Sequence, residues 1–184
     1  MASLSDKIIQ DHAELHSYYN EIMSSSDPDV LTRNQNLFVW ELARHSIGEE
    51  LVVYPLFEKL LGDKGKEMAD KDREEHLKVK KLLHTFQGLK ADDPEFKNTL
   101  QALYKDLKQH IEEEERDDLP TLEKALSSDD SESYAKSFER TKKFTPTRSH
   151  PSAPDKPPFE TVVGLMTAPM DKLADMFRKF PQNN

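Results

Sequence analysis

The sequence predicts an all-α protein: an antiparallel up-down-up-down four-helix bundle, followed by an irregular Pro-rich linker and short C-terminal helices. Three observations support this expectation. Residues 1–126 are rich in Leu, Glu, Lys, Asp and Gln, which have little strand preference, and their apolar positions recur at helical spacing. Asp-Pro-Asp at 27–29 and Asp-Pro-Glu at 93–95 are helix start signals. Seven of the 11 prolines follow residue 126, where the composition changes.

The four bundle helices are expected over residues 3–23, 28–61, 66–87 and 95–126. The first carries Ile8, His12 and Leu15 on one stripe, and the second bends at Pro55. The second helix is expected to end in Gly62-Asp63-Lys64-Gly65, and the third at Gly88. Short connections between long helices favour antiparallel neighbours. These helices form the expected domain over residues 1–126.

Two further segments follow the bundle. Residues 127–158 are expected to be a Pro/Ser-rich linker, mostly irregular apart from a short helix over 134–142. Residues 159–184 are expected to be an amphipathic helical extension with two short apolar faces split by Pro169. We expect these faces to dock on the bundle or on a second protomer. Their apolar residues are Val162, Val163, Leu165 and Met166, then Met170, Leu173, Met176, Phe177 and Phe180.

The composition excludes several classes of function. The 184 residues include no cysteine, which excludes disulfides, thiolate metal sites and a thiol nucleophile. The net charge of −9 and the lack of a dense basic cluster argue against nucleic-acid binding. No apolar run approaches the roughly 20 residues that cross a bilayer, so no membrane role is expected. A soluble cytoplasmic protein is the resulting expectation.

Histidines and carboxylates stand on the bundle helices at the spacing of a metal site. Each of the four helices carries one histidine on its apolar stripe. Two of these histidines have a glutamate four residues later, which an α-helix places on the same face. Such a set would be unfavourable in a bundle interior unless its members were paired or bound to a cation. We therefore expect six metal ligands: His12, His45, Glu49, His76, His110 and Glu114.

The two halves of the bundle also repeat one pattern. Pro28 lies 17 residues before His45, and Pro94 lies 16 before His110. Each of these histidines is followed by Glu-Glu at the fourth and fifth positions and by Pro at the tenth. A pattern of this kind is typical of a duplicated helical hairpin. The repetition makes a chance occurrence of either His/Glu pair improbable.

Ligand type and number favour iron. Six nitrogen and oxygen ligands exceed the four of a structural zinc site, and imidazoles are uncommon in calcium and magnesium sites. Two iron ions sharing carboxylates fit best, while manganese or a mixed pair also agrees with the ligand chemistry and zinc fits less well. The Glu-x-x-His spacing of ferritin-like bundles is absent. The sequence also lacks His-Glu-x-x-His, a phosphate-binding glycine loop and a GxSxG elbow.

The ordered motifs resemble those of the hemerythrin HHE cation-binding family over about residues 4–126. They are Asp11-His12, His45-x3-Glu49-Glu50 with Pro55, Glu75-His76, and His110-x3-Glu114-Glu115 with Pro120. The resemblance implies a four-helix bundle around a non-haem di-iron centre. It implies terminal ligation by the four histidines and bridging by the two glutamates. The C-terminal segment is similar to extensions of fungal members.

The sequence departs from oxygen-carrying hemerythrins in one respect. Those proteins have a fifth histidine one turn after the first on the third helix, where this chain has Lys80. His16 is either a fifth nitrogen ligand or a packed histidine. His84 is expected to be solvated, and His150 is expected to lie in the linker. Glu112, Glu113 and Glu115 are expected on a solvated face, with Glu113 or Glu115 as possible substitute ligands.

Three functions agree with these features. The leading one is a di-iron protein that binds, senses or handles dioxygen, nitric oxide, peroxide or iron. The second is an enzyme in which the same centre reduces peroxide or oxygen. The third is an interaction module with a structural metal, in which the C-terminal helices recruit a partner. The sequence identifies no separate catalytic residue, and it is consistent with a monomer or a dimer.

Overall fold

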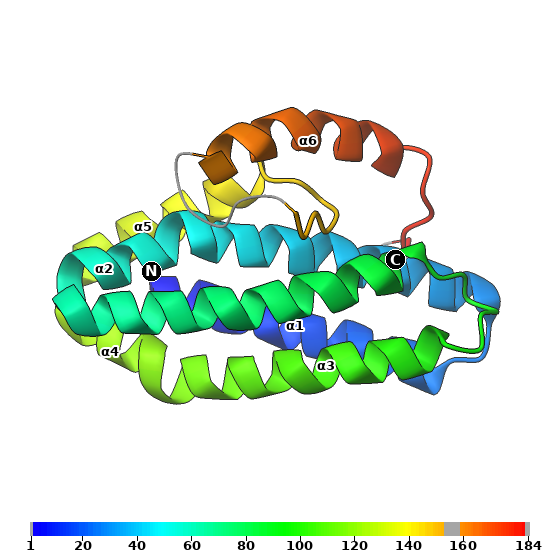
Figure 1. Cartoon of the computed structure of the whole chain (residues 1–184), viewed down its shortest axis with the longest axis horizontal. Coiled ribbons are helices and arrows are strands. Elements are labelled where there is room, and N and C mark those ends of the chain that lie inside the picture. The colour runs from blue at the N-terminus through cyan, green and yellow to red at the C-terminus, as the bar shows by residue number, and fades with distance from the viewer. Residues whose placement is uncertain (1, 153–158, 183–184) are drawn as a thin grey trace.

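A computed structural model of the chain describes residues 2–152 and 159–182, with the backbone alone described for residues 159–166. Every regular element in these ranges is helical. Four long helical segments lie side by side in alternating directions, as expected, and two further helices lie against or above them (Figure 1). The elements are α1 (Leu4–Ser24), α2 (Pro28–Gly88), α3 (Phe96–Glu113), the π-helix η1 (Glu114–Asp118), α4 (Leu119–Ala125), α5 (Ser128–Lys142) and α6 (Phe159–Asp175).

Side-chain caps fix where the first helices begin. The Ser3 hydroxyl accepts from the backbone N–H of Asp6 at 3.0 Å, and the Asp6 carboxylate accepts from the N–H of Ser3 at 2.8 Å. This reciprocal pair is a capping box. At the start of α2, Asp27 accepts from the N–H groups of Asp29 and Val30, directly before Pro28 at the first helical position. Both starts agree with the expected ones within a residue.

The connection between the second and third bundle helices is tighter than expected. In place of a loop over residues 62–65, Gly62 alone leaves helical geometry, with φ 60° and ψ −135°. L-residues with a side chain rarely adopt this conformation. Three residues later, Gly65 packs directly against the backbone carbonyl of Phe57. The two arms of α2, residues 28–61 and 63–88, therefore form a sharp helical hairpin.

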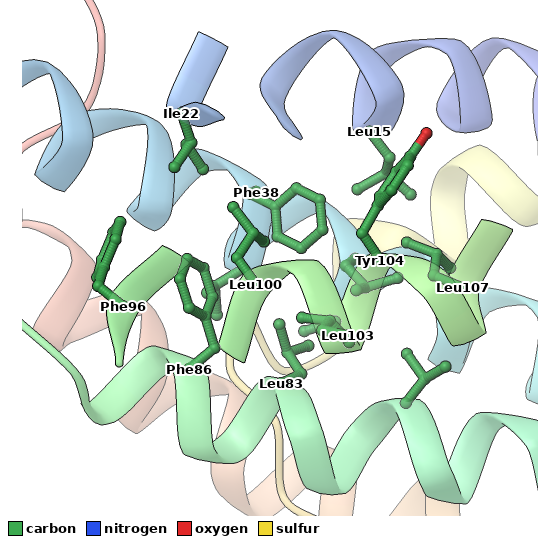
Figure 2. Close-up of a cluster of buried hydrophobic side chains, with 14 of the residues drawn as sticks. Leu15, Ile22, Phe38, Leu83, Phe86, Phe96, Leu100, Leu103, Tyr104 and Leu107 are labelled. Atoms are coloured by element: carbon green, nitrogen blue, oxygen red, sulfur yellow. The ribbon is translucent and has the colours of Figure 1, made fainter. Parts of the chain in front are cut away.

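Two apolar cores fill the bundle on either side of a polar layer. One core includes Leu15, Phe38, Leu83 and Phe96, and Figure 2 shows how side chains from α1, both arms of α2 and α3 meet in it. The other core lies toward the Gly62 turn. Each predicted metal ligand lies along its helix between a member of one core and a member of the other. The second core contains Leu4, Ile8, Val52, Val53, Tyr54, Leu56, Phe57, Ala69, Leu119, Leu122 and Phe138.

The expectation of a mostly irregular segment after residue 126 is wrong for its first part. Residues 128–142 form a regular helix, α5, which is longer than the short helix expected over 134–142. The Ser127 hydroxyl caps it by accepting from the N–H of Asp130 at 3.1 Å. Phe138 and Ala135 are buried against the bundle. The Ser/Asp-rich composition concealed a helix whose buried face is only a few residues wide.

The C-terminal extension also differs from the expectation. Pro169 lies inside one helix, α6, and does not divide two. Its described polar residues Asp171 and Asp175 face the chain, since they accept from the backbone N–H of Thr147 and Arg148 at 3.2 Å and from the Thr147 hydroxyl at 2.6 Å. Ala168 is buried and Phe180 is half-buried, but Met170, Leu173, Met176 and Phe177 are exposed. For these four residues the first expected alternative, docking on the bundle, is wrong. The side chains of Val162, Val163, Leu165 and Met166 lie outside the described residues.

None of the helices in the described ranges is long and apolar enough to cross a membrane.

The Gly62 turn supplies a stability prediction. A Cβ added at Gly65 would lie 1.9 Å from the carbonyl oxygen of Phe57. The backbone at Gly65 or at Phe57 would have to move to relieve this overlap. We expect Gly65→Ala to lower the free energy of unfolding by about 3 kcal/mol, measured by urea denaturation. Gly88→Ala is the matched control, because no atom lies within 4 Å of a Cβ there. The control is expected to be neutral or stabilising by up to about 1 kcal/mol. Equal stabilities of the two variants would contradict the packing described.

Candidate metal centre

All six sequence-predicted ligands are brought together in the polar layer between the two cores. His12 comes from α1, His45 and Glu49 from the first arm of α2, and His76 from the second arm. His110 comes from α3, and Glu114 is the first residue of η1. Every one of the six is at most 3% exposed. The helical spacing thus indicated which side chains would meet, although several of them are far apart along the chain.

The four imidazoles form two pairs. The rings of His12 and His45 are 5.0 Å apart between centroids, in an edge-to-face arrangement. The rings of His76 and His110 are 4.7 Å apart, and their Nε2 atoms approach to 3.0 Å. Two neighbouring nitrogens in each pair could hold one cation. The arrangement therefore provides two adjacent positions for metal ions.

The two carboxylates lie between these pairs. Glu49 Oε2 is 3.2 Å from His45 Nε2 and 3.4 Å from His76 Nε2, so it reaches one histidine of each pair. Glu114 Oε2 is 3.5 Å from His12 Nε2 and 3.4 Å from His110 Nε2. Potential ligand atoms of His12, His45 and Glu49 lie within 4.8 Å of one another, as do those of Glu49, His76 and His110. Glu49 belongs to both groups, which is the geometry of a shared ligand.

Five of the inner ligand atoms are buried without a hydrogen bond. They are both carboxylate oxygens of Glu49, both of Glu114, and Nε2 of His12. A buried polar group without a partner costs about 1–3 kcal/mol, and a charged one costs more. A cation between the carboxylates and the imidazoles would satisfy these atoms. The donor set of nitrogen and oxygen fits a transition metal better than calcium or magnesium.

A second ring of carboxylates surrounds the imidazoles, and each one accepts from the Nδ1 side of one histidine. This contact fixes the ring orientation and leaves Nε2 directed at the centre, as is usual for metal-binding histidines. Tautomers are inferred from this network. The pairs are Glu115 with His12 at 2.8 Å, Asp11 with His45 at 3.1 Å, Glu50 with His76 at 3.2 Å, and Glu75 with His110 at 2.9 Å.

Sequence analysis did not assign these outer roles, although a signal was present. Four acids stand directly beside inner ligands in Asp11-His12, Glu49-Glu50, Glu75-His76 and Glu114-Glu115. Successive helical residues point about 100° apart, so one residue of each dyad faces the centre and the other faces a neighbouring helix. Glu115 is exposed, as expected, and its carboxylate also contacts Nδ1 of the buried His12. Glu113 instead pairs with the exposed Lys71.

The π-helix η1 begins at the ligand Glu114. A π-turn carries one more residue than an α-turn, and such turns are frequent at functional sites. Here it allows two consecutive residues to reach the same histidine: Glu114 faces Nε2 of His12 and Glu115 faces Nδ1. The continuous α-helix expected over residues 95–126 would not place both there. No local sequence pattern predicts this change from α-helix to π-helix.

Lysines compensate the outer carboxylates that do not reach solvent. Lys80, at the position of the fifth histidine of oxygen-carrying hemerythrins, places Nζ 2.5 Å from Glu50 Oε2. It therefore contacts an outer carboxylate and not an inner ligand position. His16 lies outside the centre: its Nδ1 contacts the Tyr104 hydroxyl, and its Nε2 is 3.0 Å from Asn20 Nδ2.

The remaining two histidines also lie elsewhere. His84 is exposed, as expected, and its Nδ1 is 3.0 Å from the Ser149 carbonyl oxygen. His150 contacts Asp171 of α6 at 3.0 Å. Both contacts join the segment after α5 to other helices, and neither residue approaches the centre.

Tyr54 is a site residue that sequence analysis missed. Its hydroxyl is fully buried and lies 2.9 Å from Nε2 of His76, the nitrogen that faces the centre. A phenol oxygen is thus available beside the His76–His110 pair. Nearby Asp72 is buried as well, and one of its carboxylate oxygens lacks a hydrogen bond. Nothing in the sequence around Tyr54 distinguishes it from an ordinary core aromatic.

Electrostatics couple the imidazoles to the carboxylates. Burial alone would lower the pKa of His45, but Glu49 and Asp11 raise it to about 10. Burial likewise opposes the charged form of His76, yet Glu49 and Glu50 raise its pKa to about 9. Burial, followed by the charges of Glu114 and Asp118, raises the pKa of Asp72 to about 8. Without metal, the site is therefore most favourable when His45 and His76 are protonated.

These shifts give a pH prediction for the metal-free protein. Because the folded pKa values of His45 and His76 exceed the unfolded value near 6.5, their stabilising effect is complete below about pH 6.5 and is lost as pH rises through 9–10. The raised pKa of Asp72 adds a loss up to about pH 8. We expect protein stripped with a chelator to melt several degrees lower at pH 9 than at pH 6.5, measured by circular dichroism.

Metal-loaded protein is the control for this effect. Metal ligation requires deprotonated imidazoles, so the stabilisation by metal should increase over the same pH range. The difference in melting temperature between loaded and stripped protein should therefore widen from pH 6.5 to pH 9. Parallel pH profiles for the two forms would show that the four histidines do not ligate the metal.

Comparisons with known proteins identify the family. The hemerythrin HHE cation-binding domain model matches residues 3–122. An uncharacterized hemerythrin-like protein of Schizosaccharomyces pombe is 59% identical over 181 residues, covering 98% of this chain and 89% of the relative. That alignment includes nearly the whole extension after residue 126.

One more distant relative and one solved structure are also similar to the chain. A DNA nickase of Nostoc is 26% identical over 141 residues, and the alignment covers 76% of this chain but only 39% of that protein. A crystal structure of a hemerythrin HHE cation binding domain-containing protein from Mycobacterium kansasii superposes with a TM-score of 0.67 at 16% identity, covering 78% of this chain and 86% of that one. The structural match shows the shared helical fold. With its buried His/Glu clusters, the chain belongs to the hemerythrin HHE cation-binding domain family.

Proposed function

We propose that the centre binds two iron ions, one at the His12–His45 pair and one at the His76–His110 pair, with Glu49 and Glu114 shared between them. The observation that carries this proposal is the set of four carboxylate oxygens that lie buried and unpaired between two imidazole pairs. A single ion cannot account for both pairs. Two cations give every inner ligand atom a partner.

The ligand chemistry favours iron over the alternatives. Each position offers two imidazole nitrogens and two shared carboxylates. Structural zinc takes four ligands in a closed tetrahedral site, and manganese prefers a shell richer in oxygen. A bound iron pair supplies electron transfer and open coordination positions for a small molecule. The surrounding residues hold Nδ1 protons in place and keep Nε2 directed at the metal.

Burial limits what the centre can bind. The six inner ligands are at most 3% exposed, and two apolar cores enclose the polar layer. A diatomic molecule or a peroxide suits such a site, whereas a larger metabolite does not. The function that follows is binding or sensing of dioxygen, nitric oxide or a small oxidant. Reduction of peroxide by the same centre is the enzymatic alternative.

Iron content tests the proposal directly. Protein produced with iron should contain about two iron ions per chain and absorb in the near ultraviolet, with a change on reduction under argon. His110→Ala should lose most of this iron and lower the metal-loaded stability by about 3 kcal/mol. His84→Ala is the matched control, because His84 is exposed and lies outside the centre.

The outcomes separate the alternatives. Wild-type protein with less than a tenth of an iron per chain and no other metal would rule the proposal out. Loss of iron in both histidine variants would show that the described centre is not the binding site. Peroxide consumption well above that of free iron would favour the enzyme over a binding protein or sensor.

A second role, self-association through α6, is favoured by a specific observation. Four apolar residues on or directly after this helix, and Phe144 beside it, are exposed, while its aspartates face inward. A large exposed apolar patch of this kind is unusual on a monomer and typical of an interface. We propose that a second copy of the chain covers it, since symmetric dimers are the commonest assemblies. The exposed fractions are Phe144 64%, Met170 73%, Leu173 60%, Met176 78% and Phe177 84%.

Solution mass tests this second role. We expect wild-type protein to sediment as a dimer at micromolar concentration and the double variant Met176→Glu/Phe177→Glu to sediment as a monomer, because two buried charges would oppose the contact. Ile9→Glu is the control, since Ile9 is a 42% exposed apolar residue of α1 away from the patch. A monomeric wild-type protein would overturn the dimer while leaving the iron centre unaffected.

A further inference from the structure

Lys142, the last residue of α5, is a buried cation outside the matched family domain. The family model ends at residue 122, whereas α5 covers Ser128–Lys142. The Lys142 residue is only 4% exposed. Its Nζ contacts the Asp11 carboxylate and lies 2.5 Å from Glu41 Oε1. A lysine is rarely buried to this extent unless its charge is compensated, and here two acids from α1 and α2 compensate it.

Lys142 and His45 share a single oxygen atom. Asp11 Oδ2 accepts from His45 Nδ1 at 3.1 Å, and the same oxygen accepts from Lys142 Nζ. The ammonium therefore competes with the imidazole for the negative charge of this oxygen, and it also holds the carboxylate in position. Outer hydrogen bonds of this kind set the orientation and basicity of a metal-binding imidazole. A contact chain thus runs from α5 through Asp11 to an inner ligand.

Packing fixes α5 at the position that this contact requires. Gly48, between His45 and Glu49, lies under the helix: a Cβ there would be 2.8 Å from Phe138 Cε2 and 3.2 Å from Lys142 Cγ. The Phe138 ring stands edge-on to the His45 imidazole at 6.1 Å between centroids. The backbone of the ligand-bearing turn is therefore in direct contact with α5. Any side chain at position 48 would hold Lys142 away from Asp11.

The other side of the centre has a comparable arrangement within the family domain. The buried Glu50 accepts from His76 Nδ1 and pairs with Lys80. The two remaining outer acids, Glu75 and Glu115, are partly exposed and can be solvated. Both buried outer carboxylates, Asp11 and Glu50, are thus paired with a lysine, which is buried for Lys142 and partly buried for Lys80. On the His45 side, that lysine comes from α5.

We infer that Lys142 is a positioning residue of the metal centre, through which α5 acts on His45 by way of Asp11. The inference rests on the proposed iron centre and adds a part of the chain beyond the family domain to it. With Lys142 present, Asp11 remains charged and oriented toward His45 Nδ1. Without the ammonium, Asp11 and Glu41 are buried near one another with less compensation, and the hold on His45 weakens.

The test measures Fe(II) affinity under argon by competition with a chromophoric chelator. Replacement of an outer-shell partner typically weakens metal binding 10–100-fold, and we expect Lys142→Met to weaken it about 10-fold at one of the two iron ions. Lys136→Met is the matched control on the same helix, because Lys136 is exposed and pairs with Glu132. The control should bind both ions with wild-type affinity.

Combining Lys142→Met with a variant that lacks the Asp11 carboxylate shows whether Lys142 acts through Asp11. Asp11→Asn alone should weaken iron binding, and adding Lys142→Met to it should change the affinity less than twofold. A 10-fold loss in both backgrounds would overturn the route through Asp11. Lower thermal stability of metal-free Lys142→Met, with wild-type iron affinity and absorption spectrum, would reduce Lys142 to a purely structural residue and overturn the inference.

A neutral pair keeps the test decisive if Lys142→Met does not fold. The double variant Glu41→Gln/Lys142→Gln removes one buried charge of each sign and retains donors near Asp11. Relative to Glu41→Gln alone, it should still bind one iron ion about 10-fold more weakly, and equal affinities would overturn the inference. Wild-type protein that binds no iron would reject the proposed function itself. Wild-type protein that binds two iron ions, with equal affinities in the Lys142 variants, would reject only the inference about Lys142.

Discussion

The structure depends on the compensation of buried charge. Four imidazoles and two carboxylates lie in a layer that two apolar cores shield from water, where an unpaired ion is strongly destabilising. The inner atoms face one another, the Nδ1 atoms face outer acids, and Lys80 and Lys142 compensate the two outer acids that are buried. Cation binding at the middle of this network is the remaining requirement, since both Glu49 and Glu114 have unpaired oxygens.

The sequence predicted the inner ligands because their placement follows from local geometry. A spacing of four residues places His45 above Glu49 and His110 above Glu114 in any α-helix, whatever the surrounding fold. The helices were also predictable, since Asp27-Pro28 and the apolar periodicity are local signals. The outer acids were not assigned, because whether Asp11 meets His45 depends on how α1 packs against α2. Adjacent acids are common in a chain with 35 Asp and Glu residues, so their presence alone indicates little.

The remaining differences between expectation and structure share a physical cause. The helix α5 buries few apolar side chains, chiefly Ala135 and Phe138, so its periodicity is weak and its Ser/Asp content resembles that of a linker. Its position is determined by a contact with Gly48, which belongs to a helix far away in sequence. The π-helix at Glu114 and the one-residue turn at Gly62 are likewise selected by tertiary packing. Local propensity does not report such long-range selection.

The duplicated hairpin gives the centre an approximate two-fold symmetry. His12 and His45 belong to the first half and His76 and His110 to the second, while Glu49 and Glu114 each reach across to the opposite half. The outer acids follow the same symmetry. Asp11 matches Glu75, and each contacts a histidine of its own half. Glu50 matches Glu115, and each contacts a histidine of the opposite half. One hairpin therefore contains a complete half of the centre, and both hairpins are needed for Glu49 or Glu114 to meet a histidine of each pair.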